Sequence, residues 1–150
     1  MFQIIYIADS SKHFEQAIKE YEKRLSNKLK LVKLKPNKNG DPKTIIQKDT
    51  ENINKFLLKQ KDTYNIMLSL DGKQLDTMEF AKFLETKIDR WTNINFIIWW
   101  AFGLDEQKLE NIHYKLNLSK LTFPHSLALL VLLEQIYRVL QIIQGRTYHY

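Results

Sequence analysis

The feature that most constrains the fold is an alternation of short apolar runs with longer segments in which apolar residues recur every three or four positions. Continuous apolar runs are typical of strands buried on both faces, and the second periodicity is typical of amphipathic helices. The predicted strands span residues 2–8, 29–34, 64–70, 94–98 and 115–118. The predicted helices span residues 11–26, 44–61, 76–90, 106–114 and 124–144. This alternation predicts one α/β domain over residues 1–150, with a mostly parallel sheet and helices on both faces.

Signals for helix ends support two of these assignments. Asp76 and Glu79 have the spacing of a capping box, so they predict the start of the helix at residues 76–90. Pro124 suits the first position of the last helix, where its missing N–H would have no partner in any case. Gly145 suits the residue after that helix, because glycine adopts left-handed backbone readily.

The composition and the N-terminus exclude several classes of protein. The chain has no cysteine, and therefore no disulfide, no thiolate nucleophile and no zinc site built on cysteine. Its first residues lack the basic region and the cleavage site of a signal peptide. No apolar run approaches the ~20 residues that cross a bilayer. These features predict a soluble, cytoplasmic protein without a membrane partner.

The charge of the chain favours a polyanionic partner. The formal net charge is +6, and six lysines surround a segment rich in Asn, Gly and Pro at residues 36–42. The cluster is either a phosphate-contacting patch or a solvated, mobile loop. Its members are Lys28, Lys30, Lys33, Lys35, Lys38 and Lys43.

Residues 118–125 lie between a short predicted strand and the longest apolar helix. Ser119, Lys120 and Thr122 therefore stand at the C-terminal end of a strand, where open α/β sheets bind ligands. The residues alone are compatible with a ligand site held by main-chain groups and with an ordinary connection between a strand and a helix.

The familiar catalytic motifs are absent. The sequence has no glycine-rich dinucleotide motif, no phosphate-binding P-loop and no His-Glu-x-x-His helix. His113 is expected on the surface of a helix, and its separation from His125 defines no metal site, so no metal is predicted. Methyl transfer from S-adenosylmethionine fits such a chain, because the sulfonium is already the electrophile and the protein needs no strong nucleophile.

Several motifs, in order and position, resemble a known family. The matching segments are residues 21–25, 68–73, 102–104, 118–125 and 133–138, followed by Gly145, Tyr148 and His149. Over nearly its whole length the chain resembles the RlmH type of ribosomal RNA methyltransferase, within the SPOUT superfamily. The resemblance implies an α/β fold with a C-terminal trefoil knot, a homodimer and S-adenosylmethionine as cofactor. It also implies N3-methylation of a pseudouridine in helix 69 of 23S rRNA.

The same resemblance implies two groups of site residues. The cofactor contacts carry over to Leu68, Trp99, Leu118, Ser119, Lys120, Leu121, Thr122 and Phe123. The candidates for catalysis are Arg138, Tyr148 and His149, together with Glu134. Two simpler interpretations remain open: Glu134 and Arg138 have the spacing of a helix ion pair, and Tyr148 and His149 stand where chain ends fray.

One departure from the family puts the cofactor site in question. The family has two glycines where this chain has Trp99 and Trp100, and glycine suits a backbone that a ligand approaches closely. Either the chain is a non-catalytic, ribosome- or RNA-binding relative with a blocked pocket, or the tryptophans are natively glycine. The second hypothesis assumes a genetic code in which UGA is read as glycine. It extends to Trp91, which follows a predicted helix where glycine is expected.

Overall fold

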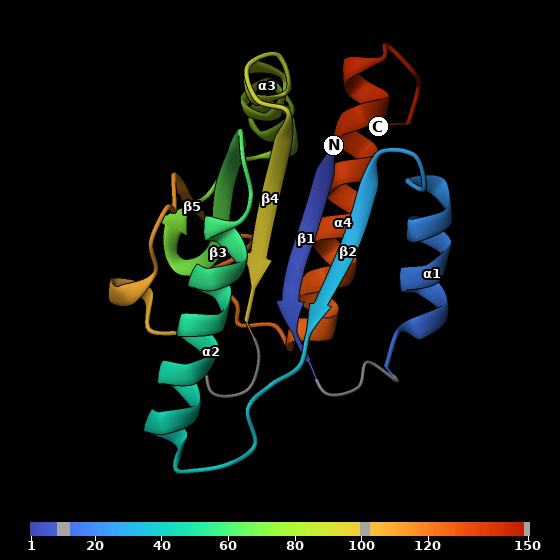
Figure 1. Ribbon diagram of the computed structural model, residues 1–150. Helices are drawn as coiled ribbons and strands as arrows, with labels where there is room; N and C mark the ends of the chain where they lie inside the picture. The colour runs from blue at the N-terminus through green and yellow to red at the C-terminus, as the bar shows by residue number, and fades with distance from the viewer. Residues whose placement is uncertain (9–12, 100–102, 149–150) are drawn as a thin grey trace.

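The computed structural model describes residues 1–8, 13–99 and 103–148. The described strands are β1 (Phe2–Ile7), β2 (Leu29–Leu34), β3 (Thr63–Lys73), β4 (Asn93–Ile98) and β5 (Tyr114–Leu116). The described helices are α1 (Glu15–Arg24), α2 (Pro42–Leu58), α3 (Thr77–Ile88) and α4 (His125–Ile143), with the short 3₁₀ helix η1 (Glu106–Lys108). Figure 1 shows that α4 runs antiparallel to the strands, from their C-terminal ends back toward the N-terminus of the chain.

The strands form one sheet in the order β2-β1-β4-β3-β5, and every pair of neighbours is parallel. The predicted parallel α/β sheet is therefore confirmed. Since all strands point the same way, the segments that follow them emerge at one edge of the sheet, where ligands bind in such folds. The passage of the C-terminal segment through a knot remains a prediction.

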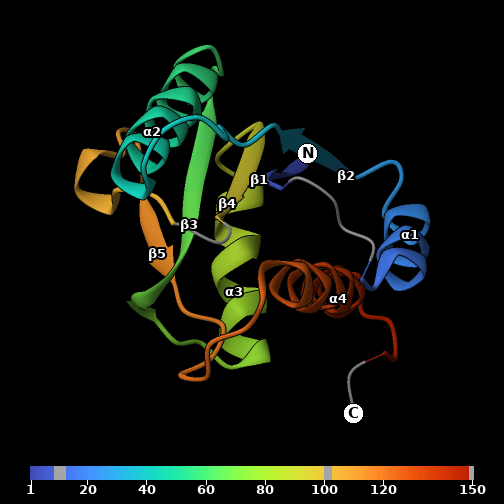
Figure 2. The same ribbon diagram turned by 90° about the horizontal axis from the view of Figure 1, so that it is seen from below.

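Helices cover both faces of the sheet, as predicted. Figure 2 shows α1, α3 and α4 on one face, and α2 with the segment around η1 on the other. Strand β1 contributes side chains to the hydrophobic core on each face of the sheet. Phe2 and Ile4 belong to the core on the α4 side, and Ile5 and Ile7 belong to the core on the α2 side. This alternation along a central strand explains why the sequence of β1 is a continuous apolar run.

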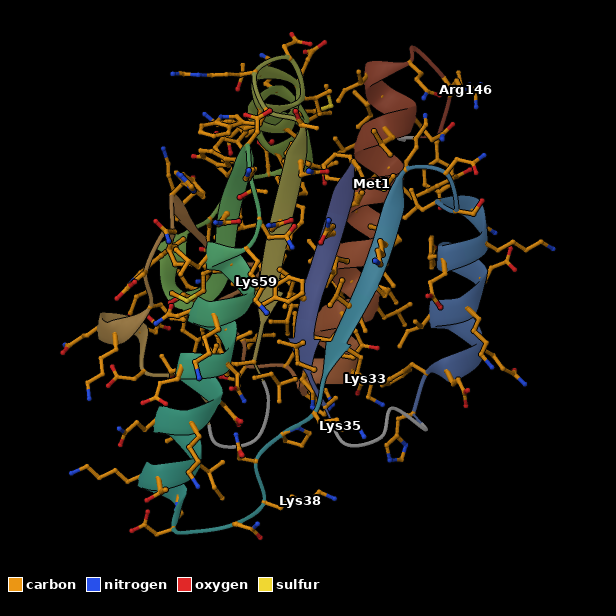
Figure 3. All side chains as sticks on the ribbon, in the orientation of Figure 1. Met1, Lys33, Lys35, Lys38, Lys59 and Arg146 are labelled. Carbon is orange, nitrogen blue, oxygen red and sulfur yellow. The ribbon has the colours of Figure 1, made fainter. Side chains whose placement is uncertain are left out.

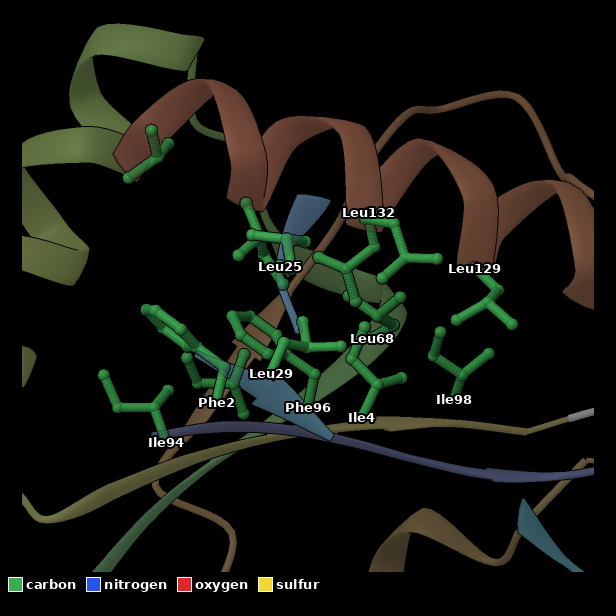
Figure 4. Packing of buried hydrophobic residues seen from close by; sticks show 14 of the residues in the cluster. Phe2, Ile4, Leu25, Leu29, Leu68, Ile94, Phe96, Ile98, Leu129 and Leu132 are labelled. Atoms are coloured by element: carbon green, nitrogen blue, oxygen red, sulfur yellow. The ribbon is translucent and has the colours of Figure 1, made fainter. Parts of the chain in front are cut away.

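The larger core lies between α4 and the sheet (Figure 4). Leu132, Ile136 and Phe96 have no exposed surface there. Each such side chain stabilises the fold by about 1.5–3 kcal/mol relative to an exposed position. With its 19 residues α4 is long and apolar enough to cross a membrane, so the expectation that no segment approaches this length was wrong. Its packing against the sheet explains the composition as that of a core helix.

The predicted helix ends are largely confirmed. The carboxylate of Asp76 accepts a hydrogen bond from the Glu79 N–H at 2.7 Å, and the Glu79 carboxylate accepts one from the Asp76 N–H at 2.8 Å. Gly145 has a φ of 68°, in the left-handed region that favours glycine after a helix. Pro124 stands one position before α4 rather than at its first residue.

The predicted helix at residues 106–114 was wrong, because only Glu106–Lys108 forms a turn of 3₁₀ helix. The following chain is held extended by distant residues instead. The Asn54 side chain donates to the Lys108 carbonyl at 2.8 Å and accepts from the Glu110 N–H at 2.9 Å. Asn111 then adopts a φ of 61°, and the His113 N–H donates to the Asn65 carbonyl of β3. Local periodicity carried no information about these long-range partners.

Candidate functional site

A cavity of about 130 Å³ lies at the C-terminal ends of β3, β4 and β5, beside the start of α4. Seven of the eight predicted cofactor residues line it. They are Leu68, Trp99, Leu118, Ser119, Leu121, Thr122 and Phe123. The eighth, Lys120, is exposed and is not among the lining residues. Residues from three separate strands thus meet in one place, although their role in binding a cofactor remains a prediction.

The loop after β5 is shaped by its own side chains. The Asn117 side-chain oxygen accepts from the Ser119 N–H at 3.0 Å, and the Ser119 hydroxyl accepts from the Leu121 N–H at 3.0 Å. The Asn117 amide also donates to the Leu70 carbonyl at 3.3 Å, which ties the loop to β3. These bonds set the loop beside the cavity. Asn117, which is buried, was missed by the sequence-based prediction.

Gly72 allows β3 and β5 to approach each other closely. A Cβ at this position would lie 2.6 Å from the carbonyl carbon of Leu116, a separation that real side chains do not show. The Asn117 N–H donates to the Lys73 carbonyl at 3.0 Å just beyond this contact. Gly72 therefore lets the extension of β3 support the loop that lines the cavity.

A polar network connects three of the segments around the cavity. Ser69, buried in the second half of β3, donates its hydroxyl proton to the Glu106 carboxylate, with oxygen separations of 3.0 and 3.2 Å. Lys115 of β5 also contacts this carboxylate, with Nζ 3.3 Å from Oε2. The Glu106 carboxylate therefore connects β3 and β5 to each other beside the cavity.

Trp99 and Phe123 are the two large aromatic side chains of the cavity lining. Trp99 is half-buried, and its indole lies 3.8 Å from the position that a Cβ on Gly103 would occupy. The apolar lining and the polar Asn117 and Ser119 suit an adenosine moiety in chemistry. The volume of about 130 Å³, however, is below the roughly 300 Å³ at which small-molecule sites begin. Trp100 lies outside the described residues.

The two internal histidines have different surroundings. His125 is half-buried beside the cavity, and its pKa is lowered from 6.5 by burial and, to a smaller extent, by the charge of Lys33. His113 lies before β5 and not on a helix, so that prediction was wrong. Its Nδ1 accepts from the Asn65 N–H at 3.0 Å, its ring stacks on Tyr64 at 5.0 Å, and burial lowers its pKa. Within the described residues no group of three His, Asp or Glu side chains could hold a metal ion.

The predicted catalytic residues lie at the far end of α4. Arg138 forms an ion pair with Glu134, with Nη2 2.6 Å from Oε1, and its guanidinium lies 4.8 Å from the centre of the Tyr148 ring. The Tyr148 ring also packs edge-on against Tyr137, so this part of the tail is ordered against the helix. Thirteen residues of helix separate Arg138 from His125, which corresponds to about 20 Å. Arg138 and Tyr148 therefore do not meet the cavity of their own chain; His149 lies outside the described residues.

The predicted lysine patch is divided between the two ends of the sheet. Figure 3 shows Lys33, Lys35 and Lys38 near the C-terminal end of β2, whereas Met1 and Arg146 lie at the opposite end. Lys28 belongs to that opposite end, because its carbonyl accepts from the Phe2 N–H at the start of β1. The prediction of one continuous patch was wrong in this respect, because a strand separates its members.

A family model described as "Predicted SPOUT methyltransferase" matches residues 1–149. The chain belongs to this SPOUT methyltransferase family. It is 42% identical over 146 residues to the "Ribosomal RNA large subunit methyltransferase H" of Clostridium botulinum, with 92% of this chain and 91% of that protein covered. It is 36% identical over 155 residues to the protein of the same name in Caldicellulosiruptor bescii, with 99% of both chains covered. A "Putative ribosomal RNA large subunit methyltransferase H" of Methanococcus vannielii is 39% identical over 147 residues.

Membership of the SPOUT methyltransferase family relates the cavity to the chemistry expected from the sequence. The loop of residues 118–123 belongs to one of the segments that carry the resemblance, and five of its six residues line the cavity. An ordinary connection between a strand and a helix would not explain why loops from β3, β4 and β5 converge on the same space.

Proposed function

We propose that this chain methylates N3 of a pseudouridine in helix 69 of 23S rRNA, with S-adenosylmethionine as the methyl donor. The observation that carries the proposal is the convergence of the predicted cofactor residues on one cavity, in a chain of the SPOUT methyltransferase family. The names of the relatives, which specify the large ribosomal subunit, support the choice of RNA. A cytoplasmic location follows from this substrate.

The lining of the cavity would hold the cofactor mainly through shape and main-chain groups. Leu68, Leu118 and Phe123 offer apolar surface to an adenine ring, and the loop of residues 118–123 offers backbone N–H and carbonyl groups. When bound, S-adenosylmethionine supplies an electrophilic methyl group, so the reaction needs no nucleophilic side chain. The protein must then orient the acceptor base and accept the proton from N3.

A homodimer would complete such a site. Arg138 and Tyr148 lie about 20 Å along α4 from the cavity of their own chain, too far to act there. In a two-fold symmetric dimer with paired α4 helices, each tail can approach the other subunit's cavity. We infer that Tyr148, His149 and Arg138 are the residues that position the acceptor and its proton, and that they act across this interface.

A non-catalytic, ribosome-binding relative is the alternative. The observation that favours it is the small volume of the cavity with Trp99 in place. If Trp99 is natively glycine, the small volume no longer argues against cofactor binding. Peptide mass spectrometry of the protein from its native source distinguishes the two cases, because tryptophan and glycine at positions 91, 99 and 100 give different peptide masses.

Calorimetric titration with S-adenosylmethionine, followed by methylation of ribosomes that lack this modification, tests the proposal. Saturable cofactor binding and a new N3-methylpseudouridine in helix 69 are expected for the active enzyme. Ribosome binding without cofactor binding, in protein of verified sequence, would instead support the non-catalytic relative.

A further inference from the structure

A second and larger pocket lies at the opposite end of α4 from the cofactor cavity. Its volume is about 490 Å³, and it is formed where the ends of α1 and α4 meet the start of β2. Arg24, Lys28 and Arg146 contribute cations to its wall, and Asn27 and Gln144 contribute carboxamides. No Asp or Glu from the described part of the chain lines it. The pocket is therefore polar and positively charged.

Arginine is concentrated at this end of the molecule. Of the four arginines in the chain, Arg24 and Arg146 line the pocket and Arg138 lies one residue from Tyr137, which also lines it. Lysine, by contrast, is spread over the whole sequence. The planar guanidinium binds phosphate through two parallel hydrogen bonds and stacks on aromatic rings, which a lysine ammonium does not do in the same way. The distribution points to phosphate recognition rather than to a general surface charge.

The arginines are interleaved with tyrosine rings that hold them in place. The Arg24 guanidinium lies 5.2 Å from the centre of the Tyr21 ring and 5.4 Å from that of Tyr137. Its Nε also donates to the Glu20 carboxylate at 3.1 Å. Tyr148 packs against Tyr137 with ring centres 4.9 Å apart. Arginine and aromatic side chains in this arrangement are typical of surfaces that bind RNA.

The helix ends at the pocket oppose an anion only weakly. The C-termini of α1 and α4 each carry a partial negative charge of about half an elementary charge. Part of the α4 end is already neutralised, because the Arg146 N–H donates to the Gln141 carbonyl at 2.9 Å and the Gly145 N–H to the Ile142 carbonyl at 3.0 Å. The charge of Arg24 is partly offset by its ion pair with Glu20, and Lys28 and Arg146 supply two further positive charges, which exceed what remains of the helix-end charge.

We propose that the pocket of Arg24, Lys28 and Arg146 binds the phosphate backbone of the RNA substrate, next to the nucleotide that is methylated. The proposal rests on the proposed function in two respects: the substrate is RNA, and Tyr148 and Arg138 contact the acceptor nucleotide. Tyr148 and Arg138, the predicted contacts to the acceptor, adjoin the pocket wall through Tyr137. The pocket therefore binds the RNA strand on one side of the reacting base. The lysines near the C-terminal end of β2 form a separate patch.

The test compares two variants that lose the same charge. One carries Arg24→Gln, Lys28→Gln and Arg146→Gln; the control carries Lys48→Gln, Lys59→Gln and Lys82→Gln, which are exposed lysines on or next to α2 and α3. Binding to ribosomes that lack the modification is measured at several salt concentrations, together with the affinity for S-adenosylmethionine. Size-exclusion chromatography reports the subunit state of each variant.

The pocket variant is expected to bind ribosomes at least tenfold more weakly than the control, with the dependence of log K on log[salt] reduced by about 2. Its affinity for S-adenosylmethionine and its subunit state should match those of the control. Equal ribosome binding by the two variants would overturn the assignment of the pocket, while the proposed function would stand. The assignment of the pocket would also be overturned if the variant lost ribosome binding only because its subunits dissociate. Wild-type protein that binds S-adenosylmethionine but no ribosome would overturn the RNA function itself.

Discussion

At the scale of single residues, Trp99 decides whether the cavity can accept a cofactor. Its indole lines a cavity of about 130 Å³, so Trp99→Gly should enlarge the site and tighten the binding of S-adenosylmethionine by tenfold or more. Tenfold corresponds to about 1.4 kcal/mol, a modest share of what filling such a site contributes. Isothermal titration calorimetry of the two proteins measures the change.

Trp91→Gly provides the matched control. Trp91 packs against Tyr64 and His113, with ring centres 5.8 and 5.4 Å apart, and does not line the cavity. Its removal should lower the unfolding free energy and leave cofactor affinity unchanged. Trp91 also has no positive φ, so its backbone does not require glycine. If Trp99→Gly bound the cofactor no better than the wild type, Trp99 would not be the obstacle.

His125 should make stability depend on pH in a defined direction. Burial, assisted by Lys33, lowers its pKa in the folded protein below the value of 6.5 expected in the unfolded chain. The unfolded chain therefore takes up a proton first as the pH falls, and this favours unfolding. The contribution of His125 is fully present above pH 6.5 and is lost as the pH falls through the lower, folded pKa.

Urea unfolding at pH 7.5 and 5.5 measures this effect. The wild type should lose more unfolding free energy between the two values than His125→Asn, which cannot be protonated in this range. Identical pH dependence in wild type and His125→Asn would show that His125 does not contribute.

At the scale of elements, the Glu106 carboxylate connects β3 with β5 through Ser69 and Lys115. Glu106→Gln should weaken the binding of S-adenosylmethionine by about tenfold, because a hydrogen bond to a charged group contributes about 1.5–3 kcal/mol. Ser69→Ala should have a similar effect, since it removes the donor of the same bond. The double variant should be little worse than either single variant, which is the sign of direct coupling.

Glu110→Gln is the appropriate control for this element. Glu110 is exposed a few residues beyond η1, and its hydrogen bond to Asn54 uses the backbone N–H rather than the carboxylate. Its variant should bind the cofactor as the wild type does. Additive losses for Ser69→Ala and Glu106→Gln would mean that the two side chains act independently and that β3 is not coupled to Glu106 through this hydrogen bond.

The elements also show what the sequence could and could not predict. Apolar runs located β1, β3 and β4, because a buried parallel strand must be apolar on both faces. The lysine-containing strands β2 and β5 were placed from shorter apolar patterns. Residues 106–114 were predicted as a helix from local pattern, and Asn54 and Asn65 from distant elements hold the chain extended instead. The cofactor loop was found through its motif. Asn117 and Glu106 were not, and Ser69 was assigned no role although it lies in the matching segment of residues 68–73. The contacts of these residues depend on which strands are neighbours.

At the scale of the whole molecule, the two ends of α4 carry different parts of the proposed reaction. The cofactor cavity adjoins His125, and the predicted acceptor contacts, with the arginine pocket, lie near Arg138, about 20 Å away along the helix. A single chain cannot bring these ends together. The sequence placed His125 and Arg138 on one helix, and the length of α4 shows that they lie about 20 Å apart within one chain, as the proposed dimer requires.

Complementation between two inactive variants tests this arrangement. Leu118→Trp should fill the cavity and abolish cofactor binding, whereas Arg138→Ala should retain cofactor binding but lose methyl transfer. When the two chains are co-expressed, half of the dimers are mixed, and each mixed dimer holds one site with an intact cavity and an intact tail. Activity should then return to about a quarter of the wild-type value. A site formed within one chain would stay inactive in every combination, because each chain carries a defect of its own.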